Sequence, residues 1–248
     1  MIEVSQLHKS FSQQQVLCGV NLKIDRGESV VIIGGSGCGK SVLLRHIIGL
    51  VQPDEGDVKI DGQSIADLSE RELIKVRRKF GMLFQGAALF DSLTVEENVG
   101  FLLDREQTMS PEAIRETVAD ALELVDLGGT QAKKPAELSG GMKKRVGLAR
   151  AIVYKPEIIL YDEPTTGLDP VVADSIDQLV IRMRDQLKCT TIVVTHDTRS
   201  MRRVGNRVML LHHGEIHANG TPDEIFNSTD PIVHKFVNGI ADPKDLEF

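Results

Sequence analysis

Apolar and polar residues alternate through the first part of the chain, and this period of two is typical of half-buried strands. The pattern predicts short strands near Ile2, at residues 15–17 and at residues 20–24, joined by turns. Residues 29–33 form a continuous β-branched run, which indicates a strand buried on both faces. Another alternating strand, at residues 57–60, ends at an Asp-Gly pair that is typical of a hairpin. We therefore expect a group of antiparallel strands followed by a buried strand.

The pattern then changes to the spacing of helices. Residues 69–78 are charged at helical spacing, and residues 81–84 return to a strand-like run. From about residue 94 to residue 153 strand signals vanish and helix formers dominate. Within this stretch Ser110 supplies a helix N-cap and Pro111 fits the first helical turn. These residues predict an inserted helical subdomain.

Two more apolar runs, at residues 157–161 and 190–194, predict buried strands. The helical pattern at residues 171–187 lies between them, which gives a β-α-β unit of a parallel sheet. A hairpin across residues 207–218 and a helix opening at Thr221 follow, before a polar tail.

These elements predict an α/β fold with a parallel-sheet core, an N-terminal antiparallel β subdomain and an inserted helical subdomain. We expect the core and its antiparallel β subdomain to occupy residues 1–85 and 157–225. The helical subdomain is expected at residues 86–156, and a C-terminal tail at residues 226–248.

Composition narrows the function classes. The 248 residues carry a formal net charge of −7, which argues against a general nucleic-acid binder. The three cysteines, Cys18, Cys38 and Cys189, are scattered, so neither a zinc site nor a disulfide framework is expected. No apolar run approaches the roughly 20 residues that span a bilayer, and the N-terminus has no signal-peptide pattern. We expect a cytoplasmic chain whose membrane role comes through a partner.

Residues 34–41 match the G-x-x-x-x-G-K-[ST] pattern of a phosphate-binding P-loop, between a predicted strand and a predicted helix. Its residues are Gly34, Gly35, Ser36, Gly37, Cys38, Gly39, Lys40 and Ser41, with Val42 following. Glycines let successive backbone N–H groups point inward at an anion. Lys40 can reach the β- and γ-phosphates, and the Ser41 hydroxyl can ligate Mg²⁺.

A second chemical signal is the apolar strand that ends in Asp162 and Glu163. Ligands of a parallel sheet bind beyond the carboxyl ends of its strands. Beside a P-loop, Asp162 is placed to hold Mg²⁺ and Glu163 to polarise an attacking water as a general base.

Residues 139–141, Ser-Gly-Gly, precede a helix with several basic residues. Such a turn at a helix N-terminus can bind an anion. An ordinary N-cap has the same sequence. Both interpretations stay open from these residues alone.

The combined motifs resemble those of the nucleotide-binding subunits of ABC (ATP-binding cassette) transporters, from Ile2 to about Ile225. The matches, in the family's order, are Phe11 at the adenine-stacking position, residues 34–41 for Walker A, Gln85 for the Q-loop, residues 138–142 for the signature, residues 158–163 for Walker B, residues 167–169 for the D-loop and His196 for the switch histidine. Two positions depart from the common pattern. Phe11 replaces the usual Tyr, and Met142 replaces the usual Gln of the signature.

The resemblance implies a P-loop NTPase cassette with a RecA-like core that binds ATP and Mg²⁺. It implies catalytic roles for Glu163, His196 and Gln85, and metal contacts from Ser41, Gln85 and Asp162. ATP contacts are implied for Phe11, residues 34–42, Ser139, Gly140, Gly141 and Asp169. In the family two copies pair head to tail, so that each ATP lies between the P-loop of one copy and the signature of the other.

One branch of the family is most similar. Residues 84–99, and the signature with its helix, resemble the ATP-binding subunit of Mla-type, MCE-associated phospholipid transporters. Met142 agrees with this branch. The resemblance implies a permease of the MlaE type, an MCE-domain lipid-binding protein and a STAS-like protein as partners. It also implies a place on the cytoplasmic face of the bacterial inner membrane, peripheral through the permease.

Three alternatives stay open. The chain can serve another importer, a cell-division signalling system, or a soluble ABC protein of DNA repair, translation or iron–sulfur assembly. The absence of zinc-type cysteines and of a basic linker argues against the repair and translation versions. The apolar segment at residues 87–95 favours a membrane partner. The tail beyond residue 231 is expected to pack on its own domain, with a contact to the second cassette as the alternative.

Overall fold

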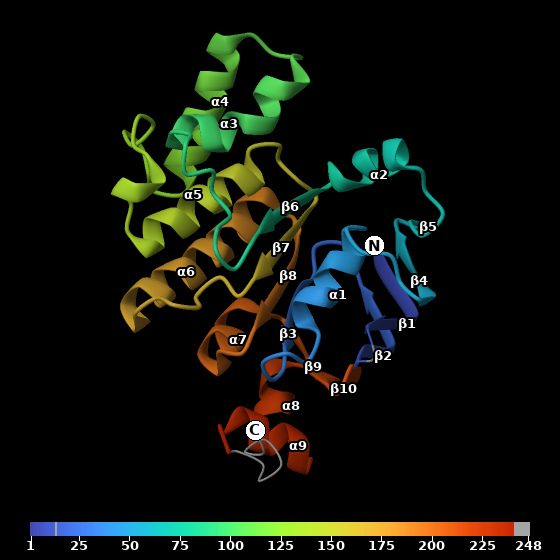
Figure 1. The fold of residues 1–248 in the computed structure, drawn as a ribbon. Helices are drawn as coiled ribbons and strands as arrows, with labels where there is room; N and C mark the ends of the chain where they lie inside the picture. Colours follow the sequence, from blue (N-terminus) through green and yellow to red (C-terminus); the bar gives the residue numbers. More distant parts are fainter. Residues whose placement is uncertain (13, 241–248) are drawn as a thin grey trace. The chain divides into compact units, whose positions relative to one another are not determined.

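The structure is a computed structural model that describes residues 1–12 and 14–240 (Figure 1). Its chain divides into two compact units. Unit 1 comprises residues 1–77 and 192–248, and unit 2 comprises residues 78–191. The domain boundaries expected from the sequence remain a proposal. The last eight residues of the predicted tail, 241–248, lie outside the described residues.

The first sheet of unit 1 is antiparallel, with the strand order β2-β1-β4-β5. Its strands are β1 (Ile2–Phe11), β2 (Gln14–Ile24), β4 (Glu55–Ile60) and β5 (Gln63–Ser64). Strand β1 pairs Ile2 with both Ile24 and Ile60, so its backbone is bonded on both sides. The pairing continues past a bulge at Gln6, whose φ is 47°. The short strands expected before residue 25 are therefore two long ones.

The second sheet contributes the strand order β10-β9-β3-β8 to unit 1. Its strands are β3 (Ser29–Ile33), β8 (Thr190–Thr195), β9 (Arg207–His212) and β10 (Glu215–Gly220), and the unit boundary falls within β8, after residue 191. Strand β3 is parallel to β9, and all of its residues are buried, as the uninterrupted β-branched run predicts. The helices of unit 1 are α1 (Lys40–Ile47), α2 (Glu70–Arg77), α7 (Thr198–Val204), α8 (Pro222–Phe226) and α9 (Pro231–Val237).

Helix α9 was not expected from the sequence. The side chain of Asp230 caps it by accepting from the N–H groups of Ile232 and Val233. Val233 and Val237 are 1% and 8% exposed, and α9 packs against α8. The described part of the tail therefore packs on its own unit.

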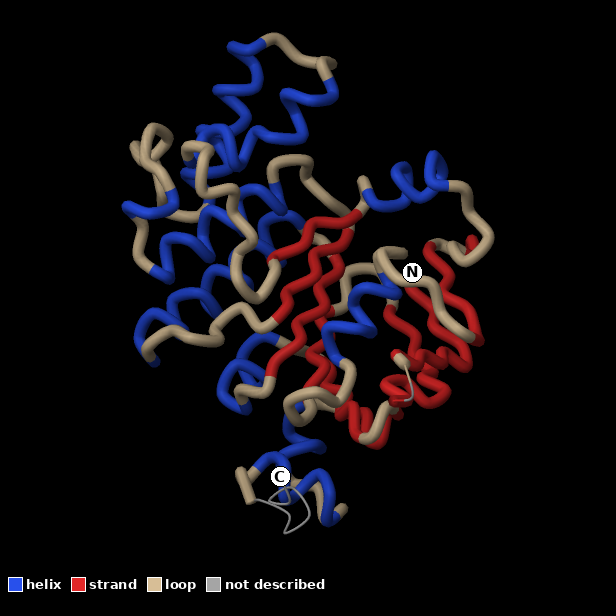
Figure 2. Tube along the Cα trace, viewed as in Figure 1, coloured by secondary structure: helices blue, strands red, loops and turns tan. Residues whose placement is uncertain are grey.

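Unit 2 is rich in helices, as Figure 2 shows in blue. Its strands β6 (Phe80–Leu83) and β7 (Ile158–Asp162) are parallel neighbours, with Phe80 opposite Ile158. Its helices are α3 (Val95–Glu106), α4 (Pro111–Leu124), the 3₁₀ turn Pro135–Glu137, α5 (Gly140–Ile152) and α6 (Pro170–Leu187). The predicted Ser110 cap is present, with the Ser110 hydroxyl accepting from Ala113 N–H at 3.3 Å. The helical stretch expected from residue 94 to residue 153 is confirmed.

Candidate functional site

The P-loop connects β3 to α1 in unit 1. A Cβ atom at Gly34 would lie 2.4 Å from the Leu211 carbonyl oxygen, and one at Gly39 would lie 2.9 Å from the Val16 carbonyl oxygen. A Cβ at Gly35 or Gly37 would meet nothing within 4 Å. The loop is therefore packed against neighbouring backbone at both ends and open between them. Such a cradle leaves space for a phosphate group.

The first residue of α1 is Lys40, which is 7% exposed. Its ammonium donates to the carbonyl oxygens of Gly34 at 2.8 Å and Gly35 at 2.9 Å, so it folds back over the loop. The N-cap is Gly39, with a φ of 103°, and a glycine has no side chain that can cap a helix. The N-terminal N–H groups of α1 and the Lys40 charge together suit an anion.

Phe11 ends β1, close to the hairpin that leads into β2, and is 45% exposed. The ammonium of Lys9 lies 5.5 Å from its ring centroid and bonds to Asp54 Oδ1 at 2.7 Å. The other carboxylate oxygen of Asp54 accepts from Ser10 N–H at 2.6 Å. The hydrogen bond from Lys9, followed by the one from Ser10, lowers the pKa of Asp54. Asp54 therefore fixes the end of β1 that carries the exposed aromatic ring.

His196 lies in unit 1, directly after β8, and its side chain is exposed. The next residue, Asp197, caps α7 by accepting from Arg199 N–H at 2.8 Å. The proposed switch histidine thus lies at the carboxyl end of a buried strand, where ligands of parallel sheets bind.

The two carboxylates expected to act in catalysis, Asp162 and Glu163, lie at the carboxyl end of β7 in unit 2. Asp162 and Glu163 are 5% and 7% exposed. Glu163 has a φ of 49°, a left-handed conformation that is uncommon for a residue with a side chain. Its Oε2 accepts from the Thr166 hydroxyl at 2.9 Å. Its orientation is therefore fixed by the backbone and by a side-chain hydrogen bond.

The signature segment, residues 138–142, starts helix α5. The Ser139 hydroxyl oxygen accepts from Met142 N–H at 3.3 Å, as an N-cap does. Its hydroxyl hydrogen can still donate to a phosphate oxygen. The two interpretations left open by the sequence are therefore compatible with each other.

A D-loop residue, Leu168, and the first turn of α6 lie against the signature glycines within unit 2. A Cβ atom at Gly141 would lie 2.6 Å from Val172 Cγ1, and one at Gly140 would lie 3.3 Å from Leu168 Cδ2. Asp169 caps α6 by accepting from the N–H groups of Val171 and Val172 at 3.0 and 3.1 Å. Asp169 thus has a structural role in its own chain.

Gln85 follows β6, with its side chain exposed. Its backbone carbonyl accepts a hydrogen bond from the buried Lys144 ammonium, which also donates to the Glu163 carbonyl oxygen at 3.1 Å. The structure therefore connects the Q-loop to the residue after β7 through one side chain of the signature helix. The sequence shows Lys144 only as one of several basic residues there, and we did not predict this role.

A second residue that the sequence did not reveal is Asn98, which is completely buried in α3. Its Oδ1 accepts from Phe90 N–H at 2.8 Å, and its Nδ2 donates to the carbonyl oxygens of Phe90, Leu93 and Thr94. Asn98 thereby fixes the turn across residues 90–94. A lone Asn inside a helical pattern gives no sequence signal for such a role.

The proposed metal donors are a hydroxyl, an amide and a carboxylate, on Ser41, Gln85 and Asp162. Such oxygen donors suit Mg²⁺, which usually keeps waters and phosphate oxygens among its ligands.

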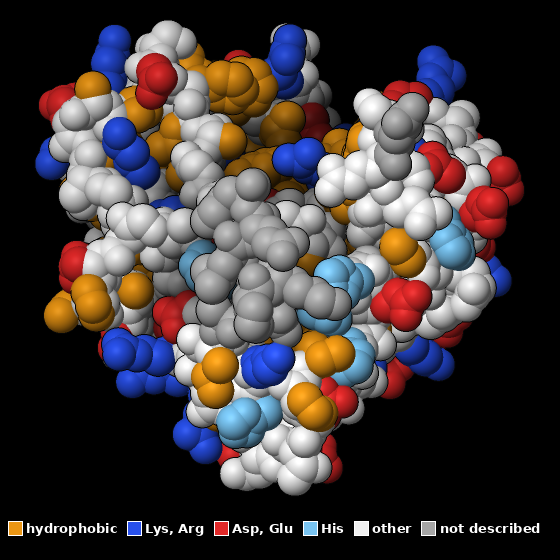
Figure 3. Space-filling view, turned by 60° about the horizontal axis from the view of Figure 1, so that its bottom comes forward, with side chains coloured by type: hydrophobic (Ala, Val, Ile, Leu, Met, Phe, Trp, Pro, Cys, Tyr) orange, Lys and Arg blue, Asp and Glu red, His pale blue; other side chains and the backbone are white. Residues whose placement is uncertain are grey.

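Figure 3 shows several histidine side chains exposed on one face. The His212 ring lies 4.1 Å from His213 and 5.9 Å from His217. Among residues 1–12 and 14–240, however, no group of three or more His, Cys, Asp or Glu residues could hold a metal ion.

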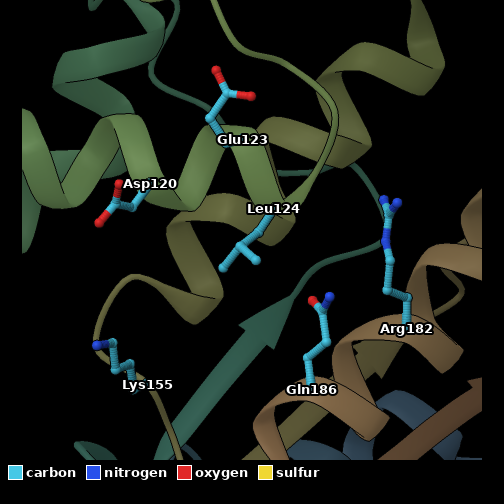
Figure 4. Close-up of a pocket in the computed structure, with 6 residues that line it drawn as sticks. All are labelled: Asp120, Glu123, Leu124, Lys155, Arg182 and Gln186. Carbon is cyan, nitrogen blue, oxygen red and sulfur yellow. The ribbon is translucent and has the colours of Figure 1, made fainter.

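A pocket of about 500 Å³ in unit 2 is separate from these motif residues (Figure 4). Its lining residues are Asp120, Glu123 and Leu124 of α4, Lys155 after α5, and Arg182 and Gln186 of α6. Arg182 donates to Asp126, which also accepts from Arg145. The pocket thus mixes both charges and lacks a phosphate-binding loop, so it does not resemble a nucleotide site.

In the part of the chain that the structure describes, no helix is long and apolar enough to cross a membrane.

Comparison with known proteins agrees with these motifs. Residues 17–166 match the ABC transporter family. Among solved structures, the dimeric ATP-binding cassette MJ0796 in a post-hydrolysis state with ADP and Pi superposes with a TM-score of 0.82 at 37% identity. The match covers 90% of this chain and 99% of that one, and it confirms the predicted fold class.

Three curated relatives have names that mention different compounds. The chloroplastic protein TRIGALACTOSYLDIACYLGLYCEROL 3 of Arabidopsis thaliana is 42% identical over 98% of this chain and 74% of its own length. The probable ribonucleotide transport ATP-binding protein mkl of Mycobacterium leprae is 43% identical over 96% and 69%. The intermembrane phospholipid transport system ATP-binding protein MlaF of Haemophilus influenzae is 40% identical over 98% and 92%.

The family match covers more than half of the chain, and these relatives match it almost from end to end. ABC cassettes dimerise, as the solved relative does. The chain therefore belongs to the ABC transporter family, as an ATP-binding subunit that binds ATP with Mg²⁺ and hydrolyses it.

Proposed function

We propose that this ATPase powers phospholipid transport between the inner and outer membranes of a bacterium. The observation that carries the proposal is the likeness to the MlaF relative, which extends over 98% of this chain and 92% of that protein. The chloroplastic relative supports it, because its name contains a diacylglycerol lipid. The mkl relative favours a second candidate, an ATPase of ribonucleotide transport.

We propose a composite ATP site, shared between two copies in head-to-tail orientation. The P-loop of one copy supplies an uncapped helix N-terminus and Lys40, and Phe11 stacks on the adenine. The signature of the other copy supplies Ser139, Gly140 and Gly141 toward the γ-phosphate. Asp169 then joins the two sites across the dimer. This arrangement gives ATP more contacts in the closed dimer than in the open one, so ATP favours closure.

In the proposed reaction, Glu163 accepts a proton from the water that attacks the γ-phosphate. Gln85 and His196 orient that water, and closure of the dimer excludes bulk water. Ser41, Gln85 and Asp162 would hold Mg²⁺, which would supply positive charge against the phosphates. Loss of the γ-phosphate removes the contacts that hold the dimer closed, and the dimer reopens.

The proposed permease contact is the docking segment, defined as residues 86–95. Its residue Phe90 is 45% exposed and packs against Phe101 of α3, with 4.7 Å between ring centroids and 36° between the ring planes. Leu102 on the same helix is 53% exposed. An exposed apolar surface of this kind suits a protein partner. We propose that a permease of the MlaE type binds here, at the cytoplasmic face of the inner membrane, with an MCE-domain protein and a STAS-like protein in the same complex.

The test is purification of the full chain with its partners from membranes of its source organism, followed by mass spectrometry of proteins and lipids. An MCE-domain protein with bound phospholipid is the expected result. Ribonucleotide uptake that depends on the chain, without an MCE partner or lipid, would replace the proposal by the second candidate. Phe90→Asp should reduce recovery of the permease, whereas Ile74→Asp, which alters a similarly exposed apolar residue of α2, should not.

A further inference from the structure

Side chains on one face of helix α5 bind backbone carbonyl oxygens in two loops of unit 2, the one that follows β6 and the one that follows β7. Lys144, Gly147 and Arg150 are spaced three residues apart, so they share this face. Lys144 donates to the carbonyl oxygens of Gln85 and Glu163. The helix therefore touches two residues to which we assign catalytic roles.

The other two positions hold the segment that follows Gln85. Arg150 donates to the carbonyl oxygens of Ala87 at 2.6 Å and Ala88 at 2.7 Å. A Cβ atom at Gly147 would lie 2.9 Å from Leu83 Cδ1 and 3.3 Å from Ala87 Cβ. The absence of a side chain at this position lets the segment lie directly on the helix.

The residues held in this way have an uncommon backbone conformation. The φ angles of Ala87, Ala88 and Glu163 are 60°, 48° and 49°. Such left-handed conformations of residues with a Cβ persist where surrounding contacts determine them, and they are frequent at functional sites. The contacts here come from Lys144 and Arg150.

The ammonium of Lys144 is itself unusual, because the side chain is only 5% exposed. Burial lowers the pKa of Lys144, while the nearby charges of Asp162 and Glu163 act in the opposite direction. A buried ammonium requires hydrogen-bond acceptors, and the two carbonyl oxygens supply them. A side chain that served only to fill space would not need this charge.

We propose that Lys144 is a positioning residue, which fixes the Q-loop backbone at Gln85 and the backbone at Glu163 to the same point of the signature helix. The inference rests on the catalytic roles proposed for these two residues. A displacement of the docking segment is then transmitted to the carboxylate that activates water, through a side chain that does not touch the nucleotide.

The test compares Lys144→Met, Lys144→Arg and wild-type full-length chain, with Lys188→Met as the matched control. Lys188 is an exposed lysine at the end of α6, so its substitution removes the same charge from the same unit. We measure kcat and KM for ATP, binding of a fluorescent ATP analogue, and chemical unfolding to correct for the folded fraction. Hydrogen exchange over residues 84–90 reports on the backbone.

We expect Lys144→Met to lower kcat by about ten- to a hundredfold, because small misplacements of catalytic groups have effects of this size. KM and analogue binding should stay within about twofold, since Lys144 acts through Gln85 and Glu163 rather than on bound ATP. Exchange over residues 84–90 should accelerate. Lys144→Arg should restore most of the turnover, because a guanidinium can also donate to two carbonyl oxygens. Lys188→Met should behave as wild type.

A kcat of Lys144→Met within about twofold of wild type would overturn the inference. So would equal impairment of the Arg and Met variants, because the hydrogen-bond donor would then not matter. If the Met variant does not fold, Lys144→Ala, which also lacks a hydrogen-bond donor, replaces it, and turnover equal to that of the Arg variant is the overturning result. Glu163→Gln is measured in parallel. If Glu163→Gln still hydrolyses ATP, the role assigned to Glu163 fails. If Glu163→Gln is inactive while Lys144→Met is normal, only the positioning role of Lys144 fails.

Discussion

The two units place their functional residues in different ways. In unit 1 the phosphate cradle consists of consecutive residues, 34–41, whose backbone is shaped by glycines. In unit 2 the functional residues come from distant positions, and Lys144 connects Gln85, 59 residues away, to Glu163. A local loop needs few outside contacts to keep its shape, whereas the second arrangement depends on long-range hydrogen bonds. We therefore expect unit 1 to dominate ATP binding and unit 2 to dominate turnover.

Glu163→Gln should give the largest effect on turnover. It is the strongest test of the division between ATP binding in unit 1 and turnover in unit 2. Removal of a general base lowers turnover by about 10²- to 10⁴-fold. ATP binding should remain, because Gln keeps the size of the side chain while the P-loop is untouched. Steady-state hydrolysis and equilibrium binding of ATP, measured on the same preparation, check both parts. Hydrolysis at the wild-type rate would remove Glu163 from its proposed role.

Lys40→Ala tests unit 1. Loss of a charge-assisted contact to phosphate should weaken ATP binding by about ten- to a hundredfold, and hydrolysis should fall with it. Titration with a fluorescent ATP analogue gives the affinity. Lys75→Ala, an exposed lysine of α2, is the control and should bind normally. An unchanged affinity of Lys40→Ala would mean that the cradle does not hold ATP as proposed.

Ser139→Ala separates the capping role from the phosphate role in unit 2. The lost N-cap should lower the free energy of unfolding by about 1 kcal/mol. Turnover should fall as well, while the affinity of the monomer for ATP stays unchanged. Ser110→Ala is a close control, because Ser110 caps α4 with the same 3.3 Å bond. It should cost similar stability without an effect on turnover, and equal turnover in the two variants would leave Ser139 with the capping role alone.

Asp54→Ala should give the smallest effect. Without its carboxylate, the end of β1 that carries Phe11 loses its bonds to Lys9 and Ser10, and ATP affinity should fall by about two- to fivefold. The control is Glu3→Ala, which removes an exposed ion pair with Lys23 from the same sheet. Isothermal titration with ATP distinguishes the two variants. Equal affinities would show that the aromatic ring does not need this support.

The same contrast explains how much could be predicted from the sequence. The P-loop and the buried strand at residues 29–33 were recognisable because their signals lie in neighbouring residues. The helical region was equally clear from its composition. The left-handed backbone at Ala87 and Ala88 was not, because alanine has no preference for that conformation. Nor could the sequence show which of the basic residues on α5 would turn toward carbonyl oxygens, since those contacts depend on tertiary packing.

Helix α9 was not predicted from the sequence for a different reason. Its Pro231 fits the first helical position and Asp230 the cap, so the local signals were present. The segment is short, and its apolar residues were assigned to a tail. Burial of Val233 and Val237 against its own unit stabilises a helix that would be marginal in isolation.

The contact between α5 and the docking segment also bears on how such cassettes diversify. Lys144 holds Gln85, the residue before the segment, and Arg150 holds Ala87 and Ala88 within it. Each bond goes to a backbone carbonyl oxygen, which every amino acid has. The side chains of this segment can therefore change during evolution without loosening the hold of the helix. Position 147 is the exception, because any side chain there would displace Leu83 and Ala87. A cassette built in this way can acquire a new membrane partner by surface substitutions while its hydrolytic machinery stays intact.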